Sequence, residues 1–255
     1  PYTDDRPKPM VEVDGRPLIA FELGWLLSYG INQVVLSCGY RWQMLQAYLG
    51  NGSRWGLDIT YAVERERLGR GGGIRFAMEH LDAGSDPVIV TNGDNITNIN
   101  LDMMLAQHRR SGGIATVALV PLTSSRGIVE TDESDCIVRF REKPELPHWI
   151  NAGVYIFERQ MRDLLPRVGD HEQELFPRLA EQGVLFAHKT RELWRTVDTA
   201  KDLTELQAEL RAGLDVPCLA PGAEPLVNSR DDEIHGPGVC ECSTAFRFTG
   251  KYGNI

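Results

Sequence analysis

Residues 18–50, with the sequence LIAFELGWLLSYGINQVVLSCGYRWQMLQAYLG, decide the fold class of this chain. Four large side chains at the start of this stretch recur at helical spacing: Leu18, Phe21, Trp25 and Tyr29. Gly30 follows them, and glycine commonly ends a helix in the left-handed conformation. The apolar run at 33–38 predicts a buried strand, and residues 42–49 predict the next helix. A helix, a buried strand and a helix in direct succession indicate an α/β protein whose parallel sheet is covered on both faces.

The same alternation continues along the chain to about residue 211. Further strands are predicted at 59–63, 87–91, 115–120, 127–131, 136–140 and 152–157. Further helices are predicted at 73–81, 101–108, 172–181 (with a break near Pro177) and 201–211. Ligands of such sheets bind beyond the carboxyl ends of the strands, so the segments that follow strands are the candidates for a site.

Composition indicates a globular protein and narrows its partners. The chain has 255 residues, and no stretch approaches the roughly 18 apolar residues that cross a bilayer, so no membrane partner is expected. A formal net charge of −9 disfavours a nucleic-acid partner. Five cysteines, an odd number without a short disulfide framework, suggest a reducing, cytoplasmic setting. Proline and glycine interrupt every pattern after residue 212, so we expect one domain over 1–212 and a loosely structured or lid-like tail over 213–255.

Asp94 is the first candidate functional residue. It follows the apolar strand predicted at 87–91 and lies in the sequence TNGDN, beside a glycine that lets the chain turn. A carboxylate at the end of a strand suits a hard divalent cation such as Mg²⁺. The alternative is an Asx turn that only closes the strand.

A glycine-rich segment over residues 64–74, ERERLGRGGGI, lies between a predicted strand and a predicted helix. The main chain at Gly69 and Gly71 can approach a flat base or a phosphate, because no Cβ intervenes. The spacing matches neither the dinucleotide-binding fingerprint nor the P-loop, and a flexible turn is the simpler reading.

Two charged segments add candidates. Glu142 and Lys143 follow the strand predicted at 136–140, where the acid could accept hydrogen bonds from sugar hydroxyls and the lysine could neutralise a phosphate. A solvated charge cluster at the end of a hairpin is the alternative. Asp198 precedes the last helix and is either a second metal ligand or the N-cap, a role for which Thr199 competes.

A zinc site is conceivable near the C-terminus but poorly supported. Its candidate ligands are Cys218, His235, Cys240 and Cys242. Their spacing matches none of the familiar structural zinc sites. We therefore expect no zinc here.

Taken together and in this order, the segments resemble the sugar-1-phosphate nucleotidylyltransferases. The carrying segments are PYTDDRPKPM, GRPLIAFELGWLLSYGI, GRGGGI, TNGDN, GIVETD, FREKP, INAGVYIF and WRTVDTAKDL, which together cover about residues 1–211. No single segment decides the matter, but their common order makes coincidence an inadequate explanation. The resemblance is greatest to the mannose-1-phosphate and heptose-phosphate guanylyltransferases. It implies a Rossmann-like fold of three layers, with a mixed, mostly parallel sheet flanked by helices.

The resemblance also implies a role for individual residues. It places Lys8 on the phosphates, Glu64 and Gly69 (with Gly71 close by) at the nucleotide, and Asp94 on a Mg²⁺ ion, which Asp198 would share. On the sugar-phosphate side it places Gly127, Glu142, Lys143 and Asn151. The implied reaction joins a nucleoside triphosphate to a sugar 1-phosphate, giving a nucleotide sugar and pyrophosphate. Relatives are commonly dimers or larger, so a homo-oligomer is expected.

Three features depart from the family pattern. The family begins with a strand and a glycine-rich loop that grips the triphosphate, and we expect both to be missing ahead of Pro1, which implies weak nucleotide binding by the chain as given. The family's second metal aspartate usually lies two residues after the tryptophan, where this chain has Thr196, and the carboxylate appears at Asp198 instead. Arg70 stands where a small or apolar residue is commoner.

Rival functions stay open at this point. GTP with mannose or heptose 1-phosphate is favoured over dTTP or UTP with glucose 1-phosphate. A non-catalytic regulatory relative that binds a nucleotide sugar or a partner protein is the chief alternative. A metal-dependent glycosyltransferase would predict Asp-x-Asp, whereas the chain has Gly93-Asp94-Asn95.

Overall fold

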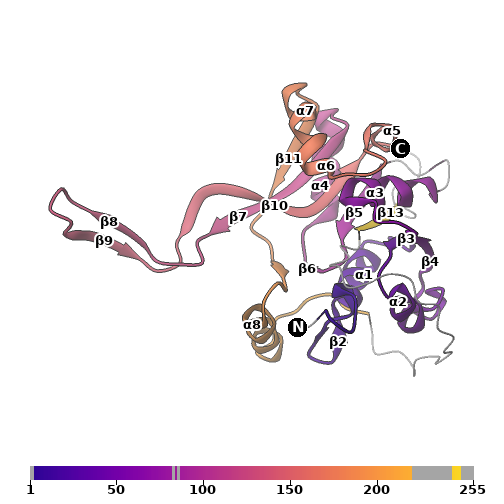
Figure 1. The fold of residues 1–255 in the computed structure, drawn as a ribbon, viewed down its shortest axis with the longest axis horizontal. Coiled ribbons are helices and arrows are strands. Elements are labelled where there is room, and N and C mark those ends of the chain that lie inside the picture. The colour runs from indigo at the N-terminus through magenta and orange to yellow at the C-terminus, as the bar shows by residue number, and fades with distance from the viewer. Residues whose placement is uncertain (1–2, 82–83, 85–86, 220–242, 248–255) are drawn as a thin grey trace.

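The computed structural model of the protein describes residues 3–81, 84, 87–219 and 243–247. Its core is a seven-stranded sheet in the order β11-β7-β10-β5-β13-β3-β4 (Figure 1). The strands are β3 (Gln33–Cys38), β4 (Asp58–Val63), β5 (Val88–Asn92), β7 (Ala115–Thr123), β10 (Glu145–Phe157), β11 (Leu185–Lys189) and β13 (Ser243–Arg247). β10 and β13 run antiparallel to both of their neighbours, and the other five strands point the same way. The prediction of a mixed sheet with mostly parallel strand directions is therefore confirmed.

Helices cover both faces of this sheet, which gives the three predicted layers. Side chains alternate along each strand, so Val34 and Leu36 enter one core cluster while Val35 enters the other. The first cluster contains residues of α1 (Leu18–Ser28), α2 (Trp42–Leu49) and α4 (Leu101–Ser111). The second contains residues of α3 (Gly69–Glu79), α5 (Met161–Leu164) and α7 (Phe176–Glu181).

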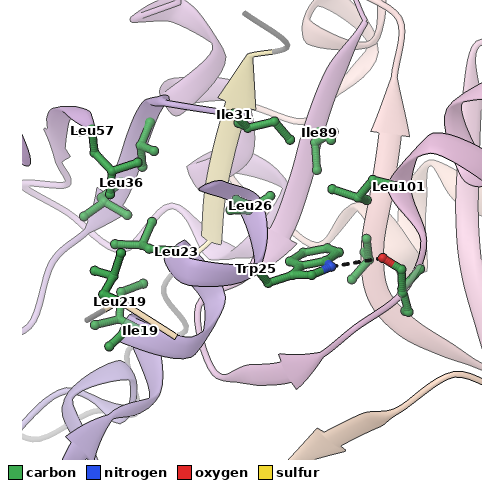
Figure 2. Close-up of a cluster of buried hydrophobic side chains, with 14 of the residues drawn as sticks. Ile19, Leu23, Trp25, Leu26, Ile31, Leu36, Leu57, Ile89, Leu101 and Leu219 are labelled. Carbon is green, nitrogen blue, oxygen red and sulfur yellow. Dashed lines mark hydrogen bonds between the residues drawn. The ribbon is translucent and has the colours of Figure 1, made fainter. Parts of the chain in front are cut away.

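Trp25 fixes α1 within the first cluster. Its indole is buried and donates a hydrogen bond of 3.0 Å to the main-chain oxygen of Ile99 (Figure 2). A buried indole N–H needs such a partner, because leaving it unsatisfied costs free energy. Helix α1 is buried along most of its length, and the wholly buried Glu22 is the one charged residue in it.

Most of the predicted elements are confirmed, but two of the helices differ from their predicted boundaries. The helix predicted at 172–181 is two helices, α6 (His171–Glu174) and α7, and Pro177 lies in the first turn of the second. The helix predicted to begin at residue 73 begins at Gly69 instead, so its start was predicted wrongly. Glycine disfavours a helix by about 1 kcal/mol per residue relative to alanine. Close packing of these glycines, described below, offsets that cost.

A hairpin of β8 (Ile128–Thr131) and β9 (Ile137–Arg141) projects away from the sheet beyond the paired ends of β7 and β10 (Figure 1). Its apolar side chains are exposed: Val129, Ile137, Val138 and Phe140. We call this segment, residues 124–144, the arm.

A third cluster packs the start of the domain against its end. It joins the small hairpin of β1 (Glu12–Val13) and β2 (Arg16–Pro17) to α8 (Ala200–Arg211). Leu214 and Val216 pack against the same cluster, and Leu219 is buried on α1. Packed structure therefore continues past residue 212, and β13 lies between β3 and β5 in the main sheet. Within the described part of the chain, no helix has both the length and the apolar character that a bilayer crossing needs.

Candidate active site

Lys8 lies between two carboxylates that come from distant parts of the chain. Its Nζ atom is 2.7 Å from Asp94 Oδ2 and 2.6 Å from Asp198 Oδ1. Lys8 begins the short 3-10 helix η1 (Lys8–Met10), and Asp94 occupies the turn between β5 and β6 (Asn95–Thr97). The structure thus brings together three residues that the sequence predicted for the phosphate and metal site.

A short main-chain ladder explains how the two acids meet. β6 pairs antiparallel with β12 (Trp194–Thr196), and Asn95 lies opposite Thr196 in the register. Asp94 directly precedes Asn95, and Asp198 comes two residues after Thr196. Both carboxylates therefore leave the same end of the ladder.

Asp198 does not cap the following helix, and its carboxylate instead contacts Lys8 and the Thr196 hydroxyl. Thr199 is the N-cap of α8, because its hydroxyl accepts from the Asp202 amide while the Asp202 carboxylate accepts from the Thr199 amide. Burial raises the pKa of Asp198, but the hydrogen bond and the charge of Lys8 outweigh burial and lower it below the usual 3.8. The Asp198 carboxylate is therefore ionised at neutral pH.

The pKa of Lys8 is raised. Burial alone would lower it, but the charges of Asp94 and Asp198 and their hydrogen bonds favour the ammonium form. One ammonium group within hydrogen-bond distance of both acids marks a point where a cation is stabilised. Two carboxylates converging on one point suit Mg²⁺, which protein sites often bind through one or two carboxylates plus phosphates. Among the described residues, at this site or elsewhere, no group of three or more acidic, histidine or cysteine side chains is placed to hold a metal, so the two carboxylates are the protein ligands that the site offers.

Glu22 lies behind this cluster and was not predicted as a site residue. Burial, followed by the neighbouring charge of Asp94, raises the pKa of its carboxyl well above 4.5, and Thr91 and the Asn95 amide oppose the shift. Burial therefore favours the neutral form of this carboxyl more strongly than water would. Its signal in the sequence was an acid on the buried face of an otherwise apolar helix.

Glu64 directly follows β4 and precedes the glycine-rich start of α3. Its two carboxylate oxygens accept from the Ser37 hydroxyl at 2.8 Å and from the Leu68 amide at 3.2 Å. A Cβ added to Gly73 would lie 2.7 Å from Glu64 Oε1, so glycine is needed for this approach. Glu64 therefore shapes the ends of β3 and β4, and its predicted nucleotide contact stays a prediction.

The glycines of α3 pack against residues 166–171, which lead into α6. Gly69 has a φ of +74°, and an added Cβ would lie 2.7 Å from the Gly169 oxygen. Gly71 donates its amide to that same oxygen at 2.9 Å, while Gly169 donates to the Leu68 oxygen at 2.8 Å. These glycines thus form a helix joined to a second loop, and the reading as a flexible turn was wrong. The predicted nucleotide contacts of Gly69 and Gly71 stay predictions.

Asn151 lies within β10, where the register with β7 becomes irregular, and this part of the strand contacts the loop that carries Asp94. The oxygen of its neighbour Ala152 accepts from Asn95 Nδ2 at 3.3 Å and from Trp194 Nε1 at 2.7 Å. Gly153 has a φ of +68°, and the amide group of Asn92 occupies the space that a Cβ would need. The segment predicted to line the sugar pocket is therefore attached to the loop that carries Asp94.

Gly127, Glu142 and Lys143 lie together on the arm. An added Cβ on Gly127 would lie 3.0 Å from Glu142 Oε2, and Lys143 adopts a φ of +45°. All three belong to the base of the hairpin, next to the paired residues Ile128 and Arg141. Figure 1 shows this hairpin extending away from the sheet. Their roles on the sugar phosphate stay predictions.

Of the residues considered for zinc, only Cys218 is described, and it is a free thiol. His235, Cys240 and Cys242 lie outside the described residues.

Comparison with known proteins assigns the chain to one family. Residues 1–213 match the family model described as "Nucleotidyl transferase". The mannose-1-phosphate guanylyltransferase of Mycobacterium tuberculosis is 36% identical over 84% of this chain and 61% of its own length. The catalytic subunit beta of the same-named enzyme from Xenopus tropicalis is 34% identical over 79% of this chain and 58% of its own length. The chain therefore spans about three fifths of the length of these relatives.

Solved structures agree at the level of the fold. HddC from Yersinia pseudotuberculosis superposes with a TM-score of 0.65 at 22% identity, covering 81% of this chain and 91% of that chain. A structure of HddC described as complexed with GMP-PN has the same TM-score at 20% identity. With the family match extending over most of its length, this chain belongs to the nucleotidyl transferase family.

Proposed function

We propose that this protein transfers a nucleotidyl group from a nucleoside triphosphate to a sugar 1-phosphate, releasing pyrophosphate. The observation that carries the proposal is the convergence of Asp94 and Asp198 on the ammonium group of Lys8. Two mutually repelling anions can approach each other only where fixed cations offset their charge. A site that presents a lysine and two cation-binding carboxylates meets that need.

The chemistry requires positioning more than acid–base catalysis. An oxygen of the sugar phosphate attacks the α-phosphorus in line, the new P–O bond forms, and the bond to the pyrophosphate oxygen breaks. The attacking oxygen is already anionic, so no general base is needed. Lys8 would offset charge on the triphosphate, and Lys143 would do so on the sugar phosphate. Asp94 and Asp198 would hold Mg²⁺, which screens phosphate charge when it is bound.

GTP with mannose 1-phosphate or heptose 1-phosphate is the favoured substrate pair. Relatives named mannose-1-phosphate guanylyltransferase support GTP, and so does the HddC structure with GMP-PN. A relative from Synechocystis named UTP–glucose-1-phosphate uridylyltransferase, 29% identical over 93% of this chain, supports UTP with glucose 1-phosphate as the second candidate. A cytoplasmic location and a homo-oligomeric state are further parts of the proposal.

Pyrophosphate release tests the function. The assay gives the protein Mg²⁺, one of GTP, UTP, dTTP, CTP or ATP, and one of several sugar phosphates. We expect turnover with at least one combination, and the fastest turnover with GTP. If no combination gave pyrophosphate, a non-catalytic role would replace this proposal.

Asp94→Asn tests the site itself. The substitution keeps the size of the side chain and removes its charge, so we expect turnover to fall by about 10²-fold or more at an unchanged melting temperature. Asp102, an exposed acid at the start of α4, provides the control Asp102→Asn. Near-normal turnover in Asp94→Asn would rule out this carboxylate as the metal ligand.

A further inference from the structure

Arg70 reaches from the first turn of α3 to two acids on a different segment. Its Nη2 atom is 2.5 Å from Asp170 Oδ2, and its Nη1 atom is 3.0 Å from Glu172 Oε2. The side chains of all three are less than one third exposed, at 28%, 22% and 24%. A planar guanidinium group binds the two carboxylates through separate nitrogen atoms, whereas an ammonium group offers a single nitrogen. A small or apolar residue at position 70 could not make this bridge.

The second oxygen of Glu172 is occupied by a pair of donors on β10. Asn151 Nδ2 donates to Glu172 Oε1 at 2.6 Å, and the Tyr155 hydroxyl donates to the same atom at 2.7 Å. Burial, followed by the charge of Glu172, raises the pKa of Tyr155 well above its usual value, so the hydroxyl stays a neutral donor. Arg70 thus binds one oxygen of the Glu172 carboxylate, and the other oxygen of the same carboxylate orients Asn151.

Asn151 connects these contacts to the candidate active site. Its Oδ1 atom accepts from the Gly153 amide at 2.8 Å, which fixes the orientation of the side-chain amide. Gly153 packs against Asn92, two residues before Asp94. A continuous series of contacts therefore runs from the glycine-rich start of α3 through Arg70, Glu172 and Asn151 to the Asp94 loop.

The backbone keeps Arg70 within reach of its acids. The hydrogen bonds of Gly169 with Leu68 and Gly71, on either side of Arg70, attach the start of α3 to the loop before α6. Two acids and one arginine leave a formal charge of −1 beside a site proposed for anionic substrates. Removing the guanidinium group would make it −2 and would leave Glu172 free to turn away from Asn151.

We propose that Arg70 is a positioning residue, which holds Glu172 so that Asn151 faces the sugar phosphate and so couples the nucleotide side of the site to the sugar side. This inference rests on the proposed function. Arg70 acts through Glu172 and does not itself contact the reacting atoms. Asp170, its other partner, anchors the guanidinium group and also caps α6, where it accepts from the Glu172 amide at 2.8 Å.

Steady-state kinetics of four variants test this inference, with each substrate varied in turn at saturating amounts of the other. The variants are Arg70→Met, Glu172→Gln, the double variant Arg70→Met/Glu172→Gln, and the control Asp170→Asn. We expect Arg70→Met to raise KM for the sugar 1-phosphate about tenfold, roughly what the loss of one charge-assisted hydrogen bond gives, with a smaller change in KM for the triphosphate. The double variant should match the worse single variant, because both substitutions break the same contact series.

The control and the conservative variant separate positioning from stability. Asp170→Asn weakens the anchor of Arg70 but leaves Glu172 and Asn151 in contact, so KM for the sugar 1-phosphate should change less than twofold even if the melting temperature falls. Arg70→Lys, which keeps the charge without the bridge, should lie between wild type and Arg70→Met. Suppose that the wild type is active. If Arg70→Met then raised both KM values equally, or if the two substitutions had additive effects in the double variant, the inference would be overturned and the proposed function would stand. Absence of wild-type turnover would overturn it together with the proposed function.

Discussion

The hydroxyl of Thr196 donates a hydrogen bond of 3.0 Å to Asp198 Oδ2. The family resemblance would place a second metal aspartate at position 196, and the carboxylate two residues later reaches Lys8 with its other oxygen. The threonine therefore supports Asp198, and two carboxylates meet Lys8 although position 196 is not acidic. This relationship leads to the first prediction.

An aspartate moved back to position 196 should partly replace Asp198. Asp198→Asn should reduce turnover by about 10²-fold and raise the Mg²⁺ concentration needed for half-maximal rate, because a charged ligand is lost. Adding Thr196→Asp to this variant should recover at least about tenfold of that loss. Pyrophosphate release measured across a Mg²⁺ titration checks both values. Thr196→Val, which removes only the hydrogen bond, is the control and should cost less than Asp198→Asn. No recovery in the double variant would show that position 196 cannot supply the ligand in this chain.

His171 should make stability depend on pH in mildly acidic solution. The ring is buried among Tyr155, Phe157 and Phe176, and neither of its nitrogens has a hydrogen-bond partner within the described structure. Burial, only partly opposed by the nearby acids Glu172 and Asp170, lowers its pKa from 6.5 to about 4.

Between pH 6.5 and about 4 the unfolded chain therefore binds a proton at His171 that the folded chain does not. Stability should fall as the pH falls through this window, by up to about 3 kcal/mol, and the loss should level off below it. Urea denaturation from pH 4 to 7 measures the slope. His171→Phe should flatten the curve, whereas replacing the exposed His148 serves as the control. An equal slope in His171→Phe would assign the effect to other groups.

Alanine in the first turns of α3 should destabilise the protein, although alanine usually stabilises a helix relative to glycine by up to about 1 kcal/mol. A Cβ at position 72 would lie 2.5 Å from the Arg167 main-chain oxygen, and one at position 71 would lie 2.7 Å from Pro166 Cγ. We expect Gly71→Ala and Gly72→Ala each to cost about 1–3 kcal/mol in chemical denaturation, because α3 and residues 166–171 must separate.

Pro166→Ala provides the matched test of that cause. It removes the ring that a Cβ at position 71 would meet, so it should reduce the cost of Gly71→Ala, although the His171 amide nitrogen at 2.8 Å keeps the relief partial. It should leave the cost of Gly72→Ala unchanged, since that contact is with main chain. Equal relief of both variants would contradict this account of the packing.

Glu142→Gln should affect one substrate only. Its side chain lies on the exposed arm against Gly127, so we expect KM for the sugar 1-phosphate to rise by about tenfold and the melting temperature to stay unchanged. Glu130→Gln on the same hairpin breaks the contacts of Glu130 with Arg139 and Arg141 and should leave both KM values unchanged. Equal KM values in wild type and Glu142→Gln would remove the acid from the sugar site.

The elements whose signals are local could be predicted from the sequence. α1, β3 and α2 follow from the pattern in residues 18–50, and the predicted ends of β3 and α2 coincide with the observed ones. The start of α3 could not be predicted in this way. Its glycines are helical because residues 166–171, nearly a hundred positions later, supply the contacts that glycine lacks by itself.

The residues of the candidate site can likewise be divided into those with a local sequence signal and those without one. Lys8, Asp94 and Asp198 each follow a recognisable segment, and the structure brings them together. Glu172 gave no local signal, because an acid in the first turn of a short helix is unremarkable until its contacts with Arg70 and Asn151 are seen. Arg70 was visible as a departure from the family pattern, but its partners depend on tertiary structure.

The β6–β12 pairing has a consequence for how this site can diverge between related proteins. The two acids are brought together by hydrogen bonds of the main chain, which do not depend on the identity of the side chains along either strand. The exposed Arg195 can therefore be replaced in a relative while the geometry of the carboxylate pair is kept. A proline in either strand would remove a main-chain amide that bonds to the other strand. It would therefore separate the two acids without altering either of them.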